Sequence, residues 1–96
     1  MTLHEFLTHV NQQTSPQSNW SQQLQALWYA EKTDWDRAHQ LCQQGDTPND
    51  AWIHANLHRE EGDISNARYW YSRAGKSEHK GSVTEERHDI IATLLQ

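Results

Sequence analysis

Residues 50–75, DAWIHANLHREEGDISNARYWYSRAG, constrain the fold of this chain more than any other stretch. Two helix-forming segments lie on either side of Gly62 and Asp63, which are suited to end one helix and cap the next. Apart from Gly62 and Gly75 the stretch contains no Gly or Pro, so nothing else interrupts helix formation. It predicts a helical hairpin whose second helix is rich in aromatic residues.

A second, weaker copy of this pattern precedes the first one in the chain. When the two copies are aligned, three pairs of matching residues superpose: Ala26 on Ala55, Asp34 on Asp63 and Ala38 on Ala67. The small Ala side chains allow paired helix axes to approach within roughly 8–10 Å, and larger side chains would push them apart. The sequence therefore predicts two helical hairpins in tandem between residues 20 and 75.

Helical patterns also flank the two hairpins. Residues 1–11 carry one apolar stripe that predicts an N-terminal helix, and the polar residues 12–19 predict a linker. Residues 82–96 predict a C-terminal capping helix, which begins with a capping box at residues 82–85. Arg87 interrupts the apolar stripe of this helix, which consists of Val83, Ile90, Ile91, Leu94 and Leu95. We expect the N-terminal helix to fold back onto the body, because so short a helix is marginal on its own. The predicted fold class is all-α, with residues 1–96 in a single domain.

Caps and helix breakers predict where the individual helices begin and end. Gly45 stands where a left-handed C-cap is favoured, and Thr47 followed by Pro48 is typical of a helix start. The helices of the hairpins are predicted at residues 20–32, 35–44, 48–61 and 64–74, and the last helix at 83–95.

Composition and charge exclude several classes of function. The chain has 13 acidic and 8 basic side chains, a net charge of −5, and no basic cluster, so we expect no nucleic-acid partner. No apolar run approaches the roughly 20 residues of a membrane span, so we expect no membrane insertion. The single cysteine, Cys42, excludes an internal disulfide and a multi-cysteine zinc site. Together with the lack of a signal-peptide pattern, it predicts a cytoplasmic protein.

The second hairpin resembles the tetratricopeptide repeat, a two-helix unit. It has that family's small residue midway along the first helix, its turn, and the small and aromatic residues of its second helix: Ala55, Gly62, Asp63, Ala67, Tyr71 and Ala74. The first copy departs from the pattern, with Thr33 in place of the turn Gly and Cys42 in place of the aromatic residue. The resemblance covers residues 20–96 and implies stacked hairpins followed by a capping helix. The hairpins are also similar to a group of small bacterial proteins, which implies no particular activity.

The resemblance further implies a binding face, because hairpins of this family expose one side of their first helices along a concave groove. In the second copy that side carries Trp52, Asn56, Arg59 and Glu60. A Trp, an amide, an Arg and a carboxylate together suit recognition of a polar peptide or a C-terminal carboxylate. The alternative is structural: Trp52 packs against the neighbouring hairpin, and Arg59 pairs with Glu60 or Asp63.

His54 and His58 are the strongest candidates for chemistry. At i and i+4 of one helix their rings point the same way, which makes a two-point metal chelate feasible. A zinc site needs more ligands, and three side chains elsewhere could supply them: His39, Glu61 or Asp36. The residue after His54 is Ala55, so the metalloprotease pattern His-Glu-x-x-His is absent. The alternative is that both histidines are buried, hydrogen-bonded core residues, and the sequence assigns no metal or other cofactor.

Other features favour structural interpretations. Cys42 lies in an apolar stripe and is expected to be a buried, inert thiol. The side chains of residues 69–71, Tyr-Trp-Tyr, differ in direction by about 100°, so at least one ring must be exposed or meet another element. Glu85 and Glu86 have the pattern of an ordinary acidic helix start.

These observations predict a non-catalytic module that binds a protein or peptide. A second hypothesis is a small metal- or metabolite-binding protein or enzyme that uses His39, His54 and His58. A fixed cleft with three convergent imidazoles and a carboxylate would favour that hypothesis. A third hypothesis is a structural homodimer formed through the N-terminal helix and exposed aromatic side chains.

Overall fold

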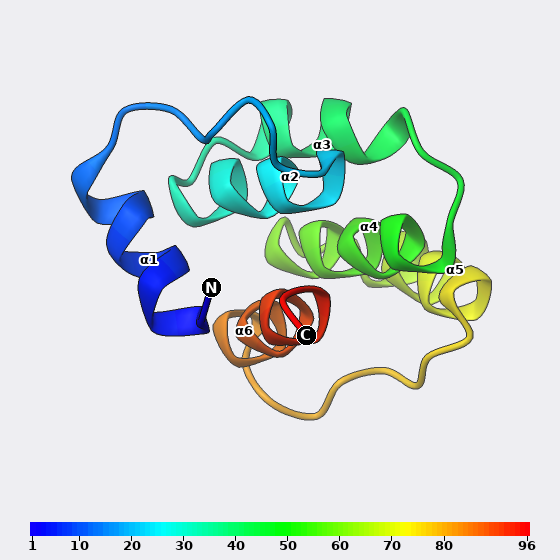
Figure 1. Ribbon diagram of the computed structural model, residues 1–96. Coiled ribbons are helices and arrows are strands. Elements are labelled where there is room, and N and C mark those ends of the chain that lie inside the picture. Colours follow the sequence, from blue (N-terminus) through cyan, green and yellow to red (C-terminus); the bar gives the residue numbers. More distant parts are fainter.

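The computed structural model describes all residues from 1 to 96 and contains helices but no strands. The predicted all-α fold class is therefore confirmed. None of the helices combines the length and apolarity required to cross a membrane. The six helices are α1 (Leu3–Gln12), α2 (Gln22–Glu31), α3 (Trp35–Gln43), α4 (Pro48–Glu60), α5 (Ile64–Ala74) and α6 (Val83–Leu94) (Figure 1).

A short polar side chain caps the N-terminus of every helix. In each case its oxygen accepts a hydrogen bond from a backbone N–H of the first turn, and α1, α4 and α6 have complete capping boxes. Each cap satisfies one of the donors that a helix start leaves unpaired. The capping residues are Thr2, Ser21, Asp34, Thr47, Asp63 and Ser82.

The helices α2 and α3 form one hairpin, and α4 and α5 form the other (Figure 1). The four small residues of the repeat pattern are all buried: Ala26, Ala38, Ala55 and Ala67. The two turns also match, because Thr33 (φ 62°) and Gly62 (φ 83°) both take the left-handed conformation. A β-branched residue takes that conformation at a cost. The repeat therefore extends to the backbone even where the first copy lacks the turn Gly.

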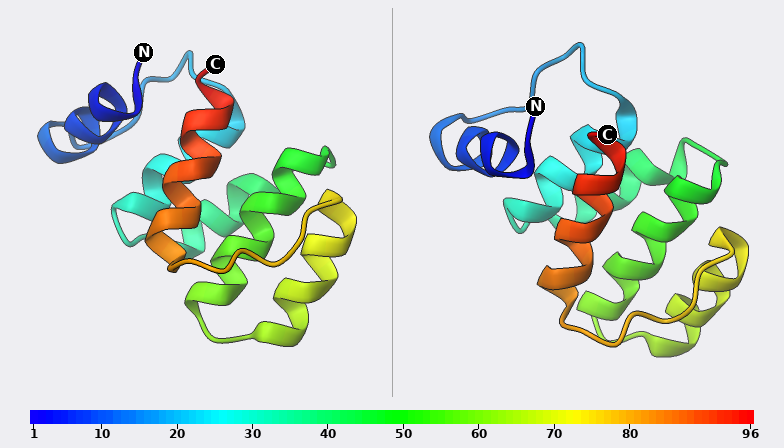
Figure 2. Two further views of the ribbon diagram at one scale, coloured as in Figure 1. Left: turned by 90° about the horizontal axis from the view of Figure 1, so that it is seen from below. Right: turned by 60° about the horizontal axis from the view of Figure 1, so that its bottom comes forward.

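The last helix, α6, lies lengthwise between α2 and α4, the first helices of the two hairpins (Figure 2). Residues 75–82 carry the chain from the end of α5 back across the molecule to the start of α6 (Figure 2). Ile90 and Ile91 of α6 are fully buried in the core. The chain's own last helix thus covers the side of the first helices that an open stack of hairpins would expose.

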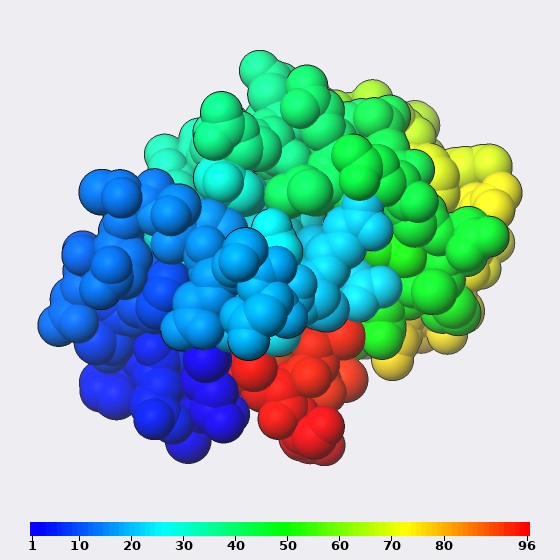
Figure 3. Space-filling view, turned by 45° about the horizontal axis from the view of Figure 1, so that its top comes forward, coloured from blue at the N-terminus to red at the C-terminus, as the bar shows by residue number.

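The N-terminal helix α1 folds back onto the body through Phe6 and Val10, which are both buried. The ring of Phe6 stacks on Trp20 with 5.4 Å between ring centroids, and the indole N–H of Trp28 lies 2.9 Å from Nδ1 of His9. α1 also contacts α6. In Figure 3 the N-terminal residues (blue) and the end of α6 (red) form one continuous surface. Both ends of the chain therefore close over the hairpins.

Two local predictions are wrong. The sequence predicts a helix start at Trp20, but α2 begins at Gln22, because Ser21 is its N-cap and accepts from the backbone N–H of Leu24; the Trp20 ring stacks on Phe6 of α1. Gly45 is not a left-handed C-cap, since the glycines with positive φ are at two other positions. A Cβ at Gly45 would collide with the carboxylate of Asp50, so the close approach of this side chain is what requires a glycine there.

Candidate functional site

The four residues of the predicted binding face lie on the side of α4 that faces α6. Each one hydrogen-bonds to a side chain of α6: Trp52, Asn56, Arg59 and Glu60. Asn56 is 1% exposed and Trp52 9%, because α6 covers them. Arg59 pairs with Glu86 of α6, at 2.9 Å, and not with an acidic residue of its own hairpin. The four side chains therefore share a face, and that face holds a helix of the same chain.

The carboxylate of Glu86 is the centre of this interface, and Glu86 is fully buried. It accepts hydrogen bonds from the Trp52 indole at 3.2 Å, the Asn56 amide at 3.0 Å and the Arg59 guanidinium at 2.9 Å. The Tyr71 hydroxyl lies 2.7 and 2.6 Å from its two oxygens, and burial together with this carboxylate raises the pKa of Tyr71. Four different side chains thus surround one buried negative charge.

The neighbouring residue, Arg87, is buried in the same interface and is 4% exposed. Its guanidinium donates to Oδ1 of Asn56 at 2.9 Å, to Oε1 of Glu60 at 2.8 Å and to the carbonyl of Ala30 at 3.4 Å. Asn56 therefore donates to Glu86 and accepts from Arg87, which fixes the orientation of its amide. We call this set of residues the α4–α6 polar network: Trp52, Asn56, Arg59, Glu60, Tyr71, Glu86 and Arg87.

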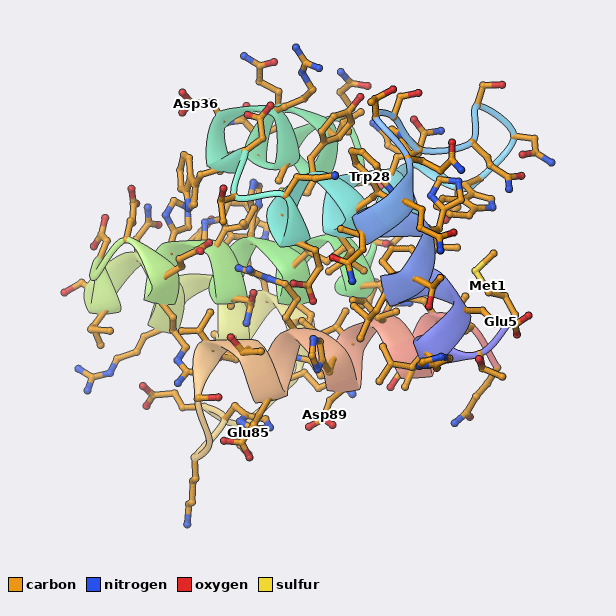
Figure 4. All side chains as sticks on the ribbon, turned by 90° about the vertical axis from the view of Figure 1, so that its left-hand side faces the viewer. Met1, Glu5, Trp28, Asp36, Glu85 and Asp89 are labelled. Carbon is orange, nitrogen blue, oxygen red and sulfur yellow. The ribbon has the colours of Figure 1, made fainter.

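Sequence reasoning missed both charged residues of α6 in this network. Glu86 is not an ordinary acidic helix start, and Arg87 does not simply interrupt the apolar stripe. The stripe itself contains the signal, because positions 86 and 87 lie three and four residues from Val83 and Ile90 and so fall on its buried side. Glu85 and Asp89, in contrast, are exposed and project outward from α6 (Figure 4).

The opposite side of α4 faces α3 and α5 and carries the candidate histidines. His54 and His58 are 4% and 5% exposed. The His39 ring of α3 lies 4.9 Å from that of His54 and 5.2 Å from that of His58, and the two α4 rings are 5.9 Å apart, measured between centroids. Trp35 stacks on His39 at 4.7 Å, and Trp70 of α5 lies 4.0 Å from His54. We call the three imidazoles the histidine cluster.

The two buried histidines differ in their hydrogen bonding. His58 matches the structural alternative, because its Nδ1 lies 2.8 Å from Oε1 of Glu61 and its Nε2 lies 3.4 Å from the Asn66 amide. Both ring nitrogens of His54 are buried without a hydrogen-bond partner in the protein. Burial, with smaller contributions from His39 and His58, lowers the pKa of His54 to about 4. Burial and the neighbouring His58 also lower the pKa of His39.

A recess of about 130 Å³ lies beside the histidine cluster, at the end of α4 where the helix begins. His54, Asp50, Trp70 and Arg73 are among the residues that line it. Asp50 is 3% exposed. Its Oδ2 accepts from the backbone N–H of Thr47 in the capping box of α4, whereas its Oδ1 is buried without a partner. The recess therefore adjoins two buried groups, one imidazole and one carboxylate oxygen, that the protein leaves unpaired.

The weaker candidates have structural roles. Cys42 is fully buried, and burial followed by the charge of Asp50 raises the pKa of its thiol to about 12, so it is no nucleophile at neutral pH. Asp36 is exposed on α3 (Figure 4). The His39 ring stacks on Trp35 and makes no hydrogen bond with Asp36. In the run of residues 69–71, Tyr69 is 53% exposed, as expected for at least one of the three rings.

Comparison with known proteins gives no family and no function for this chain. No protein-family model, no curated protein sequence and no solved structure matches the chain.

Proposed function

We propose that the protein is a non-catalytic module that binds a helical segment of a partner protein on the α6-facing side of α4. The observation that carries the proposal is the seating of α6 on that side through the Glu86 carboxylate. Trp52, Asn56 and Arg59 together present an indole N–H, an amide and a guanidinium to one carboxylate. Such an array recognises a carboxylate by direction as well as by charge.

The contacts of α6 define the chemistry that a partner helix would need. It carries an acidic residue for the Trp52, Asn56 and Arg59 donors, followed at once by an arginine for Glu60. Apolar residues stand four and five positions after the acidic one, where α6 has Ile90 and Ile91. This is the helix-in-groove mode of recognition, with anchors along one helical face.

The partner helix takes the place of α6, so α6 is its intramolecular competitor. A short tether holds a competing segment at an effective concentration on the order of millimolar. Residues 75–82, which are mostly exposed, form that tether. Binding is therefore weak until α6 is loosened, and a second copy of the chain that exchanges α6 is an alternative occupant. The resemblance to the tetratricopeptide repeat supports the binding role. The single cysteine, Cys42, supports the proposal that the protein acts in the cytoplasm.

The experiment uses a labelled synthetic peptide of residues 80–96 and the full-length protein, with binding measured by fluorescence anisotropy. The acceptor is a Glu86→Gln/Arg87→Gln variant, in which α6 is held less firmly. We expect the peptide to bind this variant at least tenfold more tightly than the wild type, whose own α6 competes. A peptide carrying the same two substitutions is the control and should not bind.

Equal, undetectable binding of both peptides to a variant that remains folded by circular dichroism would contradict the proposal. In that case α6 is a permanent part of the core. Sedimentation of the wild-type protein over a range of concentrations checks the alternative occupant. A stable dimer that the Glu86→Gln/Arg87→Gln substitutions dissociate would assign the face to a second copy of the chain instead.

A further inference from the structure

The side of α4 that faces α3 and α5 buries an imidazole that has no partner in the protein. His54 is 4% exposed, and neither of its ring nitrogens hydrogen-bonds to another group of the protein. The large majority of buried polar side-chain atoms in proteins are paired, so an exception of this kind calls for a reason, such as a bound ion. The Oδ1 atom of Asp50, which lines the same recess as His54, is a second buried atom without a partner.

The rings around His54 are spaced like the ligands of a metal ion. The three centroid distances within the histidine cluster are 4.9, 5.2 and 5.9 Å. Imidazole centroids lie roughly 5 Å apart in a tetrahedral zinc site with Zn–N bonds of about 2.0–2.1 Å. The helices α3 and α4 therefore already hold the rings at coordination spacing. Metal binding requires the rings to rotate about their side-chain bonds until one nitrogen of each faces a common centre.

We propose that His39, His54 and His58 bind one divalent transition-metal ion of the zinc class. His54 and His58 supply a chelate from successive turns of α4, and His39 supplies the third nitrogen from α3. Glu61 already accepts a hydrogen bond from Nδ1 of His58 at 2.8 Å, the kind of contact that orients a metal-binding ring. Nε2 of His58 is then the nitrogen for the metal, and it exchanges its long contact of 3.4 Å with the Asn66 amide for the metal bond. Asp50 Oδ1, which has no partner in the protein and belongs to the recess beside His54, would accept a hydrogen bond from a water molecule that completes the coordination.

A rival group lies at the other end of the cluster. This group consists of His58, Glu61 and Asp63, and its ligand atoms lie within 4.8 Å of one another. The nitrogens of the three imidazoles do not lie that close together in their present orientations. His58 belongs to both sets, so the two carboxylates distinguish them, and both carboxylates are already engaged. Glu61 bonds to His58, and Asp63 caps α5 by accepting from the backbone N–H of Asn66. Both carboxylates are exposed, so nothing in their surroundings calls for an ion.

The test uses the full-length protein, freed of metal with a chelator and then titrated with Zn²⁺ and separately with Co²⁺. Calorimetry measures stoichiometry and affinity, thermal unfolding measures stabilisation, and visible absorption reports tetrahedral Co²⁺. We compare the wild type with His54→Gln, His39→Asn and Asp63→Asn. The control is His4→Gln, which removes an exposed histidine from α1. Asn is as good a helix cap as Asp, so Asp63→Asn leaves the start of α5 intact.

We expect one equivalent of Zn²⁺ to bind the wild type, His4→Gln and Asp63→Asn, with a rise in the unfolding temperature. His54→Gln and His39→Asn should each weaken binding at least tenfold. The proposal is overturned if the wild type binds neither ion, or if both histidine variants bind as well as the wild type. It is also overturned if Asp63→Asn loses binding while His54→Gln keeps it. If His54→Gln does not fold, His39→Asn decides, because that side chain is only partly buried.

Discussion

The two sides of α4 bury polar side chains in opposite ways. Toward α6, the carboxylate of Glu86 and the guanidinium of Arg87 are matched by donors and acceptors from several elements, and the amide of Asn56 bonds to both. Toward α3 and α5, His54 is as buried as Arg87 but hydrogen-bonds to no group of the protein. One helix of 13 residues thus has a side whose buried polar groups are hydrogen-bonded and an opposite side where a buried imidazole is not.

The two sides therefore differ in their contribution to the free energy of unfolding and in their capacity to bind a ligand. A fully satisfied network fixes one arrangement, because removing any member leaves its partners buried and unpaired. An unpaired imidazole lowers stability, so its presence makes sense at a site that binds something. In the metal-free protein this contrast has measurable consequences for stability.

The largest effect is expected from Glu86→Ala. The substitution leaves the Arg59 guanidinium without its ion pair and removes the acceptor from three further side chains of the α4–α6 polar network. Breaking a buried ion pair from one side costs about 3–5 kcal/mol. We expect urea denaturation to measure a loss of that order in the free energy of unfolding. Asp89→Ala, which removes an exposed carboxylate of the same helix, should cost only a few tenths. A similar small loss for Glu86→Ala would contradict the network.

The second effect is a loss of stability on mild acidification. The unfolded chain protonates His54 below a pKa of about 6.5, whereas the folded protein does so only below about 4. Proton uptake therefore favours unfolding as the pH falls between these values, and the cost reaches about 2 kcal/mol at pH 5. The imidazoles of His39 and His58 and the carboxylate of Asp50 face His54 in the folded state. The readout is the difference between wild type and His54→Leu in urea midpoints at pH 7.5 and pH 5. Identical pH dependence in both would show that His54 has an ordinary pKa.

His54→Leu should also stabilise the protein at pH 7.5, where both folded and unfolded His54 are neutral. The substitution removes two buried polar atoms that have no partner and keeps an apolar side chain against Trp70. Relief of that desolvation cost is worth about 1 kcal/mol. A loss of 2 kcal/mol or more in urea denaturation would mean that the ring makes a stabilising contact that the geometry does not contain.

The smallest effect is expected from Glu61→Gln on the same side of α4. Glu61 bonds to Nδ1 of His58 at 2.8 Å, but its side chain is 40% exposed, so water screens the interaction. We expect a loss below about 1 kcal/mol, which thermal unfolding would register as a shift of a few degrees at most. A loss as large as that of Glu86→Ala would show that this side of α4 depends on its polar contacts as much as the other.

Local signals in the sequence predicted much of the fold. The caps Thr47, Asp63 and Ser82 act where the pattern placed them, because a capping side chain acts on the turn that follows it directly. The small residues Ala26, Ala38, Ala55 and Ala67 are buried as the repeat predicted. Gly45 was misjudged because the group that excludes a Cβ, the Asp50 carboxylate, arrives from the next helix.

The candidate site was less predictable, because it depends on where α6 packs. The periodicity of α6 placed Ile90 and Ile91 inside, but a charged residue at a buried position reads as an interruption until its partners are known. Those partners lie roughly 30 residues away in the sequence, on α4. The closeness of His39 to the α4 histidines has the same origin, since only the packing of α3 against α4 brings them together.

The most direct measurement is an NMR titration of the histidine rings in metal-free protein from pH 8 to pH 3.5. If the side of α4 toward α3 and α5 buries an unpaired imidazole, one ring should titrate near pH 4, and its signal should be missing from His54→Gln. If the His54 ring titrates with a pKa near 6.5, like an exposed histidine, it is not a buried imidazole without a hydrogen-bond partner. The two sides of α4 would then not differ in the way described, and the reason to place a metal ion there would be lost.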